Sequence, residues 1–283
     1  MPGLIPPPQA QVEADVARAL AEDIGSGDVT ASLLADGPQH GYVIARESAI
    51  VAGRPWFDAC FRALDPTVQI SWRVDEGTRT EAQSVVCTFA GHSRALLSAE
   101  RCALNFLQTL SATATRTAEY VAAVAGTGTR ILDTRKTLPG LRLAQKYAVR
   151  AGGGDNHRIG LFDALMLKEN HILAAGSIAA AAAHARLRYP LLPLIIEVEN
   201  LDELRQALQV DCTRILIDDF SLGDMREAVR IAAGRIPLEV SGGVELARVR
   251  EIARTGVDCI SVGALTKHVR AIDFSMRLGD PPR

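Results

Sequence analysis

The chain has 283 residues and a mass of 30.3 kDa, which suits one large domain or two domains of ordinary size. Hydrophobic residues make up 48% of it and charged residues 23%, a composition that supplies a packed core and excludes a disordered chain. The formal net charge of -2 predicts no general attraction to nucleic acid or to an anionic membrane.

Three features of the sequence predict a protein of the cytoplasm. The longest uncharged stretch, residues 172–185, is short and rich in alanine, so we interpret it as a packed helix and not as a membrane span. The N-terminus, MPGLIPPPQAQ, has no basic region before an apolar one and predicts an extended tail, not a secretion signal. The five cysteines are odd in number and lack CxxC spacing, which indicates neither a disulfide framework nor a zinc site.

The first part of the chain, up to about residue 112, has the mixed pattern of an α+β domain. Apolar residues at helical spacing predict helices over 12–22 and 100–110. Strand-like runs predict strands over 41–45, 68–74 and 84–89.

From about residue 129 onward, short apolar strands alternate with amphipathic helical segments, as in repeated βα units. The expected strands are 130–133, 164–167, 194–198, 214–217, 237–240 and 259–262. The last four follow one another at roughly 20 to 25 residues, which is typical of one strand and one helix per unit in a (β/α) barrel.

Polar residues or glycines end every one of these expected strands. In order they are Asp133-Thr134-Arg135-Lys136, Lys168, Glu197 with Glu199, Asp218-Asp219, Ser241-Gly242-Gly243 and Gly263-Ala264. The carboxyl ends of parallel strands converge on one rim, where substrates bind, so these residues predict the active site. Glu199 and Asp219 lie just beyond their strands, and we interpret both as helix N-caps.

The segment from Arg130 to Lys168 is strongly basic although the whole chain is slightly acidic. It holds three acidic residues against eight basic ones, which are Arg130, Arg135, Lys136, Arg142, Lys146, Arg150, Arg158 and Lys168. This excess of positive charge predicts a multiply anionic ligand. We expect Arg142, Lys146 and Arg150 on the exposed face of a helix, so the basic residues that follow strands are better placed to bind it.

Glycines and carboxylates at the later strand ends indicate the class of ligand. Gly242 and Gly263 let backbone N–H groups approach phosphate oxygens, and late barrel strands commonly form a phosphate site. Glu197 and Asp218 end neighbouring strands and suit sugar hydroxyls or Mg²⁺. The residues by themselves therefore predict chemistry on a phosphorylated sugar with Mg²⁺.

Three motifs closely resemble the quinolinate phosphoribosyltransferase family: TRKTLPGLR (134–142), QKYAVRAGGGDNHRIGL (145–161) and LKENH (167–171). Supporting matches are EDIGSGDVT (22–30), ERCALNFLQ (100–108), IEVEN (196–200), EVSGGV (239–244) and VDCISVGALTK (257–267). The resemblance implies an α/β fold with an N-terminal α/β sandwich domain over 1–112, to which 271–283 returns. An incomplete (β/α) barrel of the type II phosphoribosyltransferase kind, carrying the active site, is implied over 113–270.

The resemblance also implies an activity. The family transfers the phosphoribosyl group of phosphoribosyl pyrophosphate to quinolinate with decarboxylation, giving nicotinate mononucleotide, pyrophosphate and CO₂ in de novo NAD biosynthesis. The resemblance thus implies a glycosyltransferase that uses Mg²⁺ and forms a homodimer, with each active site completed by the partner subunit, and we expect this homodimer to be cytoplasmic.

Site residues follow from the same resemblance, position by position. The implied quinolinate pocket comprises Arg101, Thr134, Arg135, His157, Arg158 and Lys168. The implied phosphoribosyl pyrophosphate site comprises Lys136, Lys168, Glu197, Asp218, Ser241, Gly242, Gly243, Val262, Gly263 and Ala264. Lys136, Lys168, Glu197 and Asp218 are implied as catalytic, and Glu197 and Asp218 also as metal ligands, directly or through water.

Four positions depart from the family pattern. Gln145 stands where Glu is frequent, Cys102 where Thr is frequent, SATAT (111–115) where SGIAT is commoner, and Asp219 where Asn is often found. None of them removes a cation that would contact the ligands. We therefore expect these departures to affect local packing and not activity.

Three other readings of the site remain open at this point. The first is a phosphoribosyltransferase for another pyridine or anionic acceptor, for example nicotinate, or the acceptor of the related enzyme found beside molybdate transport genes. A monocarboxylate acceptor would not need four cationic side chains around it. The second is a Schiff-base aldolase with Lys168 as its nucleophile. The third is a phosphosugar-binding regulator, which would bind ligand without turnover.

Overall fold

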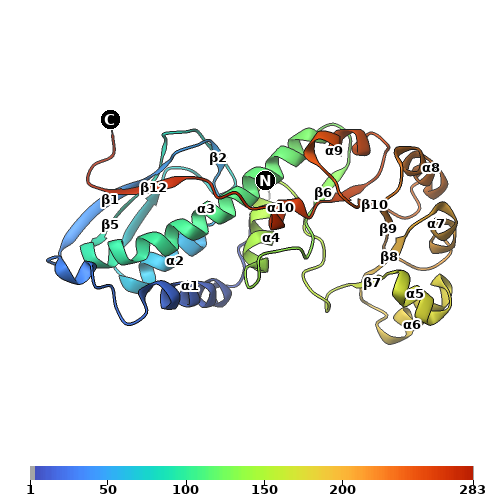
Figure 1. The fold of residues 1–283 in the computed structure, drawn as a ribbon, viewed down its shortest axis with the longest axis horizontal. Helices are drawn as coiled ribbons and strands as arrows, with labels where there is room; N and C mark the ends of the chain where they lie inside the picture. The colour runs from blue at the N-terminus through green and yellow to red at the C-terminus, as the bar shows by residue number, and fades with distance from the viewer. Residues whose placement is uncertain (1–3, 283) are drawn as a thin grey trace. The chain divides into compact units, whose positions relative to one another are not determined.

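In the computed structural model, which describes residues 4–282, the chain forms two compact units (Figure 1). Unit 1 comprises the chain up to Ala118, Leu138–Gly153 and the C-terminal stretch from His268. Unit 2 comprises Glu119–Thr137 and Gly154–Lys267. The chain therefore passes between the units several times.

Unit 1 is built on a four-stranded antiparallel sheet of order β12-β1-β5-β3. Its strands are β1 (Pro38–Ala45), β3 (Gln69–Trp72), β5 (Val85–His92) and β12 (Phe274–Leu278), and β2 (Ala49–Ile50) pairs separately with β4 (Arg79–Thr80). Its helices are α1 (Gln9–Ile24), a short 3-10 helix (Ala31–Leu33), α2 (Arg54–Leu64), α4 (Arg142–Ala151) and most of α3 (Ser93–Ala123). The strands and helices predicted in this part of the chain are confirmed, although α3 is longer and continues across the boundary predicted at residue 112.

Aromatic side chains fill the core of unit 1. Trp56 is fully buried, and its indole N–H donates to Asp15 of α1 at 3.0 Å. Phe61 packs against Phe57 and Phe89 at ring-centroid distances of 4.9 and 5.7 Å, which ties α2 to the sheet. The ring of Tyr147 lies 5.5 Å from that of Trp56, so α4, which the sequence assigned to the barrel domain, packs into this core instead.

The N-terminal tail is shorter than the sequence predicts. Helix α1 begins at Gln9, directly after Pro8, because a proline is tolerated just before the first helical turn, where its missing N–H costs no hydrogen bond. Residues 1–3 of the predicted tail lie outside the described residues.

Unit 2 is built on a six-stranded parallel sheet of order β6-β11-β10-β9-β8-β7. Its strands are β6 (Arg130–Leu132), β7 (Leu165–Leu167), β8 (Leu194–Val198), β9 (Arg214–Asp218), β10 (Leu238–Ser241) and β11 (Cys259–Ser261). All six predicted strands are confirmed. The first two strands of the unit, β6 and β7, form opposite edges of the sheet, which is the order expected of an incomplete barrel.

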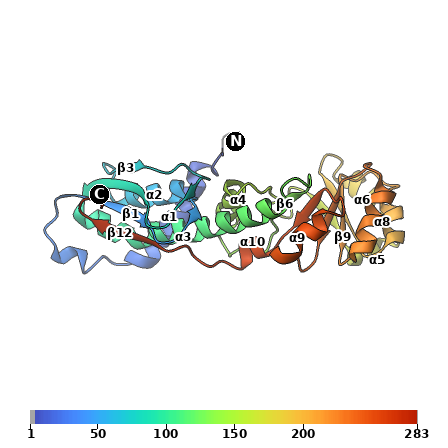
Figure 2. The same cartoon turned by 90° about the horizontal axis from the view of Figure 1, so that it is seen from above.

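In unit 2, two helices follow β7, and one helix follows each of β8, β9, β10 and β11. They are α5 (Glu169–Ala175), α6 (Ile178–Arg188), α7 (Leu201–Ala207), α8 (Leu222–Ala232), α9 (Leu246–Ala253) and α10 (Ala264–Lys267). Figures 1 and 2 both show α6 and α8 on the outer side of strand β9. The single helix predicted over 172–185 is wrong: Gly176, with a φ of 86°, adopts a left-handed conformation that ends α5 and separates it from α6.

Two findings bear on the expected environment of the protein. No helix within residues 4–282 is both long and apolar enough to cross a membrane. The five cysteines are buried and free of disulfide bonds.

Candidate active site

The carboxyl ends of the strands in unit 2 place the predicted ligand-binding residues along one edge of the sheet. Asp218 at the end of β9 pairs in register with Ser241 at the end of β10. Val262, just after β11, donates its N–H to the carbonyl of Leu132 at the end of β6 at 2.9 Å. Predicted site residues that are far apart in the sequence are therefore neighbours on this edge.

Two glycines at this edge allow close approaches that a side chain would block. A Cβ at Gly263 would lie 2.9 Å from Cδ of Lys136 and 3.5 Å from the hydroxyl of Thr134. Gly242, with a φ of 98°, adopts a conformation that favours glycine, and a Cβ there would contact the Asp218 carboxylate at 3.4 Å. Glycine at both positions therefore lets charged side chains pass close to a backbone suited to phosphate.

Two hydrogen bonds hold the backbone of Lys136 in the turn after β6. Its N–H donates to the hydroxyl of Thr134 at 3.0 Å, and its carbonyl accepts from the hydroxyl of Thr266 at 2.7 Å. These bonds connect the turn after β6 to α10, which begins directly after Gly263.

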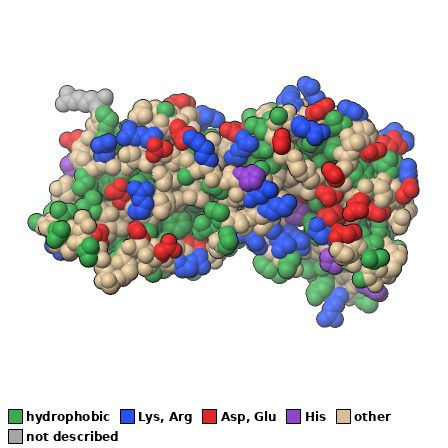
Figure 3. All heavy atoms as spheres, viewed as in Figure 1, with side chains coloured by type: hydrophobic (Ala, Val, Ile, Leu, Met, Phe, Trp, Pro, Cys, Tyr) green, Lys and Arg blue, Asp and Glu red, His purple; other side chains and the backbone are tan. Residues whose placement is uncertain are grey.

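Lys168 and Glu197 form an ion pair across neighbouring strand ends. Nζ of Lys168 lies 2.8 and 3.0 Å from the two carboxylate oxygens of Glu197. The carboxylate side chain is 10% exposed and the lysine side chain 45% exposed, so the lysine is the more accessible partner of the pair. Glu197 also lines a cavity of about 410 Å³ together with Glu199 and residues of α5. Figure 3 shows acidic side chains gathered over this part of unit 2.

Arg158 is a partly buried cation beside a second cation. Its guanidinium donates to the carbonyl of Ala164 at 3.2 Å and approaches the sulfur of Met166 at 3.7 Å. Burial, followed by the positive charge of Arg135, lowers the pKa of Arg158. Two guanidinium groups close enough to repel each other favour an anion between them.

The loop that carries His157 and Arg158 is tied to the edge strand β6. Asp155 extends the sheet beyond β6 through hydrogen bonds of 2.8 Å to the carbonyl of Ile131 and 3.1 Å from the N–H of Asp133. Asp133, which is fully buried, accepts from the side chain of Asn156 at 2.7 Å and from the N–H of His157 at 2.8 Å. Asp133 therefore holds this loop in place.

Glu239, in the middle of β10, is a buried charge that the sequence analysis did not select. Its carboxylate is fully buried, 2.7 Å from the guanidinium of Arg214 and 3.4 Å from Nε2 of His157. Burial by itself raises the pKa of Glu239, but the adjacent His157 ring and the positive charge of Arg214 outweigh it and leave the pKa below its ordinary value. A charged residue between two apolar ones inside a strand was the available signal.

Two expectations about residues near the site are wrong. The N-caps of α7 and α8 are Asn200 and Ser221, not Glu199 and Asp219, because short polar side chains at those positions accept the free N–H groups of the first turn. Lys146 is buried, at 3% exposure, and not on an exposed helix face, because α4 is enclosed on most of its sides.

Comparisons with known proteins cover almost the whole chain. Residues 28–111 match the model of the quinolinate phosphoribosyl transferase N-terminal domain, and residues 113–277 match that of its C-terminal domain. The chain belongs to the quinolinate phosphoribosyltransferase family. It is an enzyme of pyridine nucleotide biosynthesis, a transferase.

Members of this family from other organisms are similar over their full length. A probable nicotinate-nucleotide pyrophosphorylase [carboxylating] of Synechocystis is 42% identical over 280 residues, 96% of this chain and 94% of the relative. The nicotinate-nucleotide pyrophosphorylase [carboxylating] of Mycobacterium leprae is 40% identical, covering 93% of this chain and 95% of the relative. The structure of the nicotinate-nucleotide pyrophosphorylase from Francisella tularensis, 44% identical, matches with a TM-score of 0.95 over 99% of this chain and 100% of that one.

Two departures from the family pattern have a structural account. Gln145, which is fully buried, accepts the N–H of Leu138 at 2.8 Å and donates to the hydroxyl of Thr113 at 3.4 Å, a donation that a carboxylate cannot make. Asp219 has a φ of 55°, in the left-handed region that Asp and Asn adopt more readily than other side chains. Asp therefore serves the backbone at this position as Asn does.

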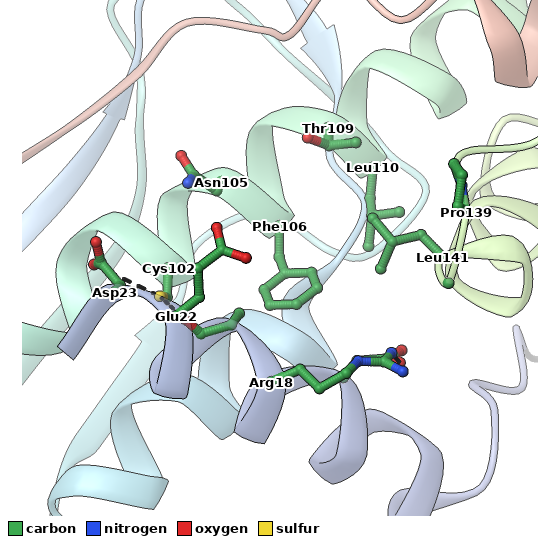
Figure 4. Close-up of a pocket in the computed structure, with 13 residues that line it drawn as sticks. Arg18, Glu22, Asp23, Cys102, Asn105, Phe106, Thr109, Leu110, Pro139 and Leu141 are labelled. Atoms are coloured by element: carbon green, nitrogen blue, oxygen red, sulfur yellow. Dashed lines mark hydrogen bonds and ion pairs between the residues drawn. The ribbon is translucent and has the colours of Figure 1, made fainter. Parts of the chain in front are cut away.

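The departure at Cys102 belongs to a cavity of about 360 Å³ within unit 1 that contains none of the predicted site residues. Figure 4 shows Cys102 of α3 beside Asp23 of α1. The thiol approaches the carbonyl of Ala19 at 3.3 Å and the Asp23 carboxylate at 3.7 Å. Burial, followed by the charge of Asp23, raises the pKa of Cys102 to about 11, so the thiol stays protonated and links two helices.

Among the predicted site residues, Arg101 stands apart. It lies on α3 in unit 1, where it is exposed, whereas the other predicted residues of both substrate sites lie in unit 2. The residues of unit 2 are brought together by the sheet; the contribution of Arg101 stays a prediction.

The carboxylates of the site suit Mg²⁺ held jointly by protein and substrate. No group of three potential metal-ligating side chains occurs within residues 4–282. Glu197 and Asp218 end the adjacent strands β8 and β9. Since Mg²⁺ commonly takes one or two carboxylates, waters and substrate phosphates, two carboxylates at this edge fit it.

Proposed function

We propose that this chain joins quinolinate to phosphoribosyl pyrophosphate at the carboxyl edge of the sheet in unit 2. The products are nicotinate mononucleotide, pyrophosphate and CO₂. Membership of the quinolinate phosphoribosyltransferase family supports the reaction, and the charges at this edge support the place.

The observation that carries the acceptor pocket is the pair of guanidinium groups at Arg135 and Arg158. Burial, and after it the positive charge of Arg135, lowers the pKa of Arg158, and a dianion bound between the two groups relieves their repulsion. We assign the two carboxylates of quinolinate to the pocket formed by Thr134, Arg135, His157, Arg158 and Lys168, with Arg101 of the partner subunit completing it.

We assign phosphoribosyl pyrophosphate to the glycine-rich part of the same edge. Ser241, Gly242, Gly243, Gly263 and Ala264 offer backbone N–H groups to its phosphates, and Lys136 and Lys168 supply compact positive charge. Val262, whose own N–H is bonded to the carbonyl of Leu132, positions Gly263 beside them. Glu197 and Asp218 hold Mg²⁺, directly or through water. Bound there, Mg²⁺ neutralises charge on the pyrophosphate.

The reaction needs no nucleophilic side chain. The pyridine nitrogen attacks the sugar carbon as the bond to pyrophosphate breaks, and pyrophosphate leaves with the bonding electron pair. Positive charge that develops on the sugar is stabilised by Glu197 or Asp218. Loss of CO₂ from the carbon next to the now positive nitrogen leaves an electron pair there, which takes up a proton.

The ion pair at Lys168 argues against the aldolase reading. A Schiff-base lysine must be free to attack a carbonyl group, whereas Nζ of Lys168 is held against both oxygens of the Glu197 carboxylate. The cation cluster likewise argues against a monocarboxylate acceptor.

The test is ultraviolet detection of nicotinate mononucleotide from quinolinate, phosphoribosyl pyrophosphate and Mg²⁺, with nicotinate run in parallel. We expect product from quinolinate, none when Mg²⁺ is removed by a chelator, and little from nicotinate. Product from nicotinate alone overturns the acceptor assignment, and ligand binding without product overturns the activity.

We further propose a cytoplasmic homodimer in which Arg101 acts in the partner's site. Arg101→Ala and Lys168→Ala chains, each inactive, are unfolded and refolded together. Because each contact in a two-fold dimer occurs twice, half of the randomly formed dimers carry both defects in one site and none in the other. We expect activity of roughly one quarter of the wild type. Background activity, with heterodimers verified by native mass spectrometry, contradicts the shared site.

A further inference from the structure

Three side chains contact one another in a row inside unit 2, and only one of them, His157, belongs to the proposed substrate pocket. Arg214 of β9 contacts Oε2 of Glu239 on β10 at 2.7 Å, and Oε1 of Glu239 faces Nε2 of His157 at 3.4 Å. Glu239 is fully buried, and its neighbours in the strand, Leu238 and Val240, are apolar. Burying a carboxylate is unfavourable unless cationic or donor groups surround it, so Glu239 depends on Arg214 and His157, which face its two oxygens.

The other side of the imidazole ring is attached to the acceptor pocket. Nδ1 of His157 accepts the backbone N–H of Arg158 at 2.7 Å. A backbone N–H can only donate, so Nδ1 carries no proton, and the ring proton resides on Nε2, which faces Glu239. The ring therefore connects a buried carboxylate to the backbone of Arg158.

We propose that Glu239 is a positioning residue for the acceptor pocket: it holds His157 as the Nε2–H tautomer, and the ring in turn fixes Arg158. The inference rests on the proposed function, in which Arg158 binds a carboxylate of quinolinate. Arg158 is pushed away from Arg135 by charge repulsion, so a fixed backbone at Arg158 keeps its guanidinium in the pocket. Arg214 balances the buried charge of Glu239.

The kinetic test uses Glu239→Gln, which removes the charge but keeps the shape, and the double variant Arg214→Gln/Glu239→Gln, which removes both charges. Glu251→Gln, on the exposed surface of α9, is the matched control. Melting temperature, kcat and the KM for each substrate are measured for all of them.

We expect Glu239→Gln to raise the KM for quinolinate about ten- to hundredfold, the loss typical of one hydrogen bond to a charged group. The KM for phosphoribosyl pyrophosphate should stay within about twofold, because the phosphate side of the site does not involve His157. The double variant should recover melting temperature, since no buried charge is left unpaired, but should keep the raised KM for quinolinate. A double variant that melts like the wild type and binds quinolinate normally, or an equal rise in both KM values, overturns the proposal.

A second measurement keeps the proposal testable even if the variants do not fold. The chain has six histidines, and ¹⁵N labelling of their rings reports the tautomer of each, with His157→Gln used to assign the relevant signal. We expect the Nε2–H form for His157 in the wild type, and either the Nδ1–H form or a doubly protonated ring overturns the proposal. The measurement does not depend on turnover, so a wild-type enzyme that fails to use quinolinate rejects the proposed function separately.

Discussion

Both units bury polar side chains, but aromatic side chains are concentrated inside unit 1, whereas the buried charges of unit 2 lie near its proposed ligand-binding edge. Both tryptophans and five of the seven phenylalanines lie in unit 1, so its stability comes mainly from apolar burial. Unit 2 encloses Asp133, Glu239 and His157, each of which contacts the loop or the side chains of the acceptor pocket. The comparison separates residues that stabilise the fold from residues that order the site.

The largest effect on stability is expected from Trp56→Ala in unit 1. Removing this fully buried ring leaves a cavity and takes one donor from Asp15, which keeps its contacts with Arg18 and Gln11, at a cost of about 3 to 5 kcal/mol in the free energy of unfolding. Urea denaturation measures the loss, with Leu191→Ala, at 94% exposure, as the control that should stay within about 0.5 kcal/mol. A folded Trp56→Ala enzyme with altered quinolinate binding but normal stability contradicts the division between the units.

Arg158→Ala in unit 2 should show the opposite behaviour. Losing a charged partner of a desolvated carboxylate costs about 2 to 5 kcal/mol of binding, or roughly thirtyfold or more in the KM for quinolinate. Steady-state kinetics measure it against Arg188→Ala, an exposed arginine at the end of α6. Normal quinolinate kinetics in Arg158→Ala would refute the placement of the pocket.

Asp218→Asn should separate the two halves of the site within unit 2. The loss of one charge beside Gly242 should raise the concentration of phosphoribosyl pyrophosphate or Mg²⁺ needed for half-maximal activity. We expect a rise of about ten- to hundredfold, the range for a hydrogen bond to a charged group. Calorimetry should find quinolinate binding unchanged. Equal loss of both ligands points instead to a folding defect.

The smallest effect is expected from Asp219→Asn. Both residues tolerate the left-handed backbone at this position, so we expect a change within about 0.5 kcal/mol in unfolding free energy. Asp219→Val, whose branched side chain does not tolerate this conformation, should cost about 1 to 2 kcal/mol more. Thermal unfolding of the two variants side by side measures the difference, and equal stability contradicts the backbone explanation.

The sequence predicts most of unit 2 because each strand there is a short apolar run that ends in polar residues. All six strands were found in this way, and the ends of β9 and β10 are neighbours as expected. The break at Gly176 was missed because alanines on both sides continue the helical pattern, and only the left-handed conformation of the glycine ends the helix.

Residues that act through distant partners were harder to predict. Glu239 belongs to no recognisable local motif, and its partners His157 and Arg214 reach its two oxygens only in the folded chain. Arg101 is an ordinary exposed helical arginine by its own pattern, and it entered the prediction only through the family resemblance. Lys146 was misplaced because its helix looks amphipathic in isolation, whereas tertiary packing encloses it.

The attachment of Asp155 to β6 has a consequence for how the protein behaves in a crowded solution. An open parallel sheet presents unpaired N–H and C=O groups along its outermost strand, and such edges recruit strands from other molecules. Here the backbone of Asp155 occupies part of that edge, pairing with Ile131 and Asp133. The loop that carries Arg158 therefore also covers part of the β6 edge, and we expect a change that loosened it to impair solubility together with the proposed catalysis.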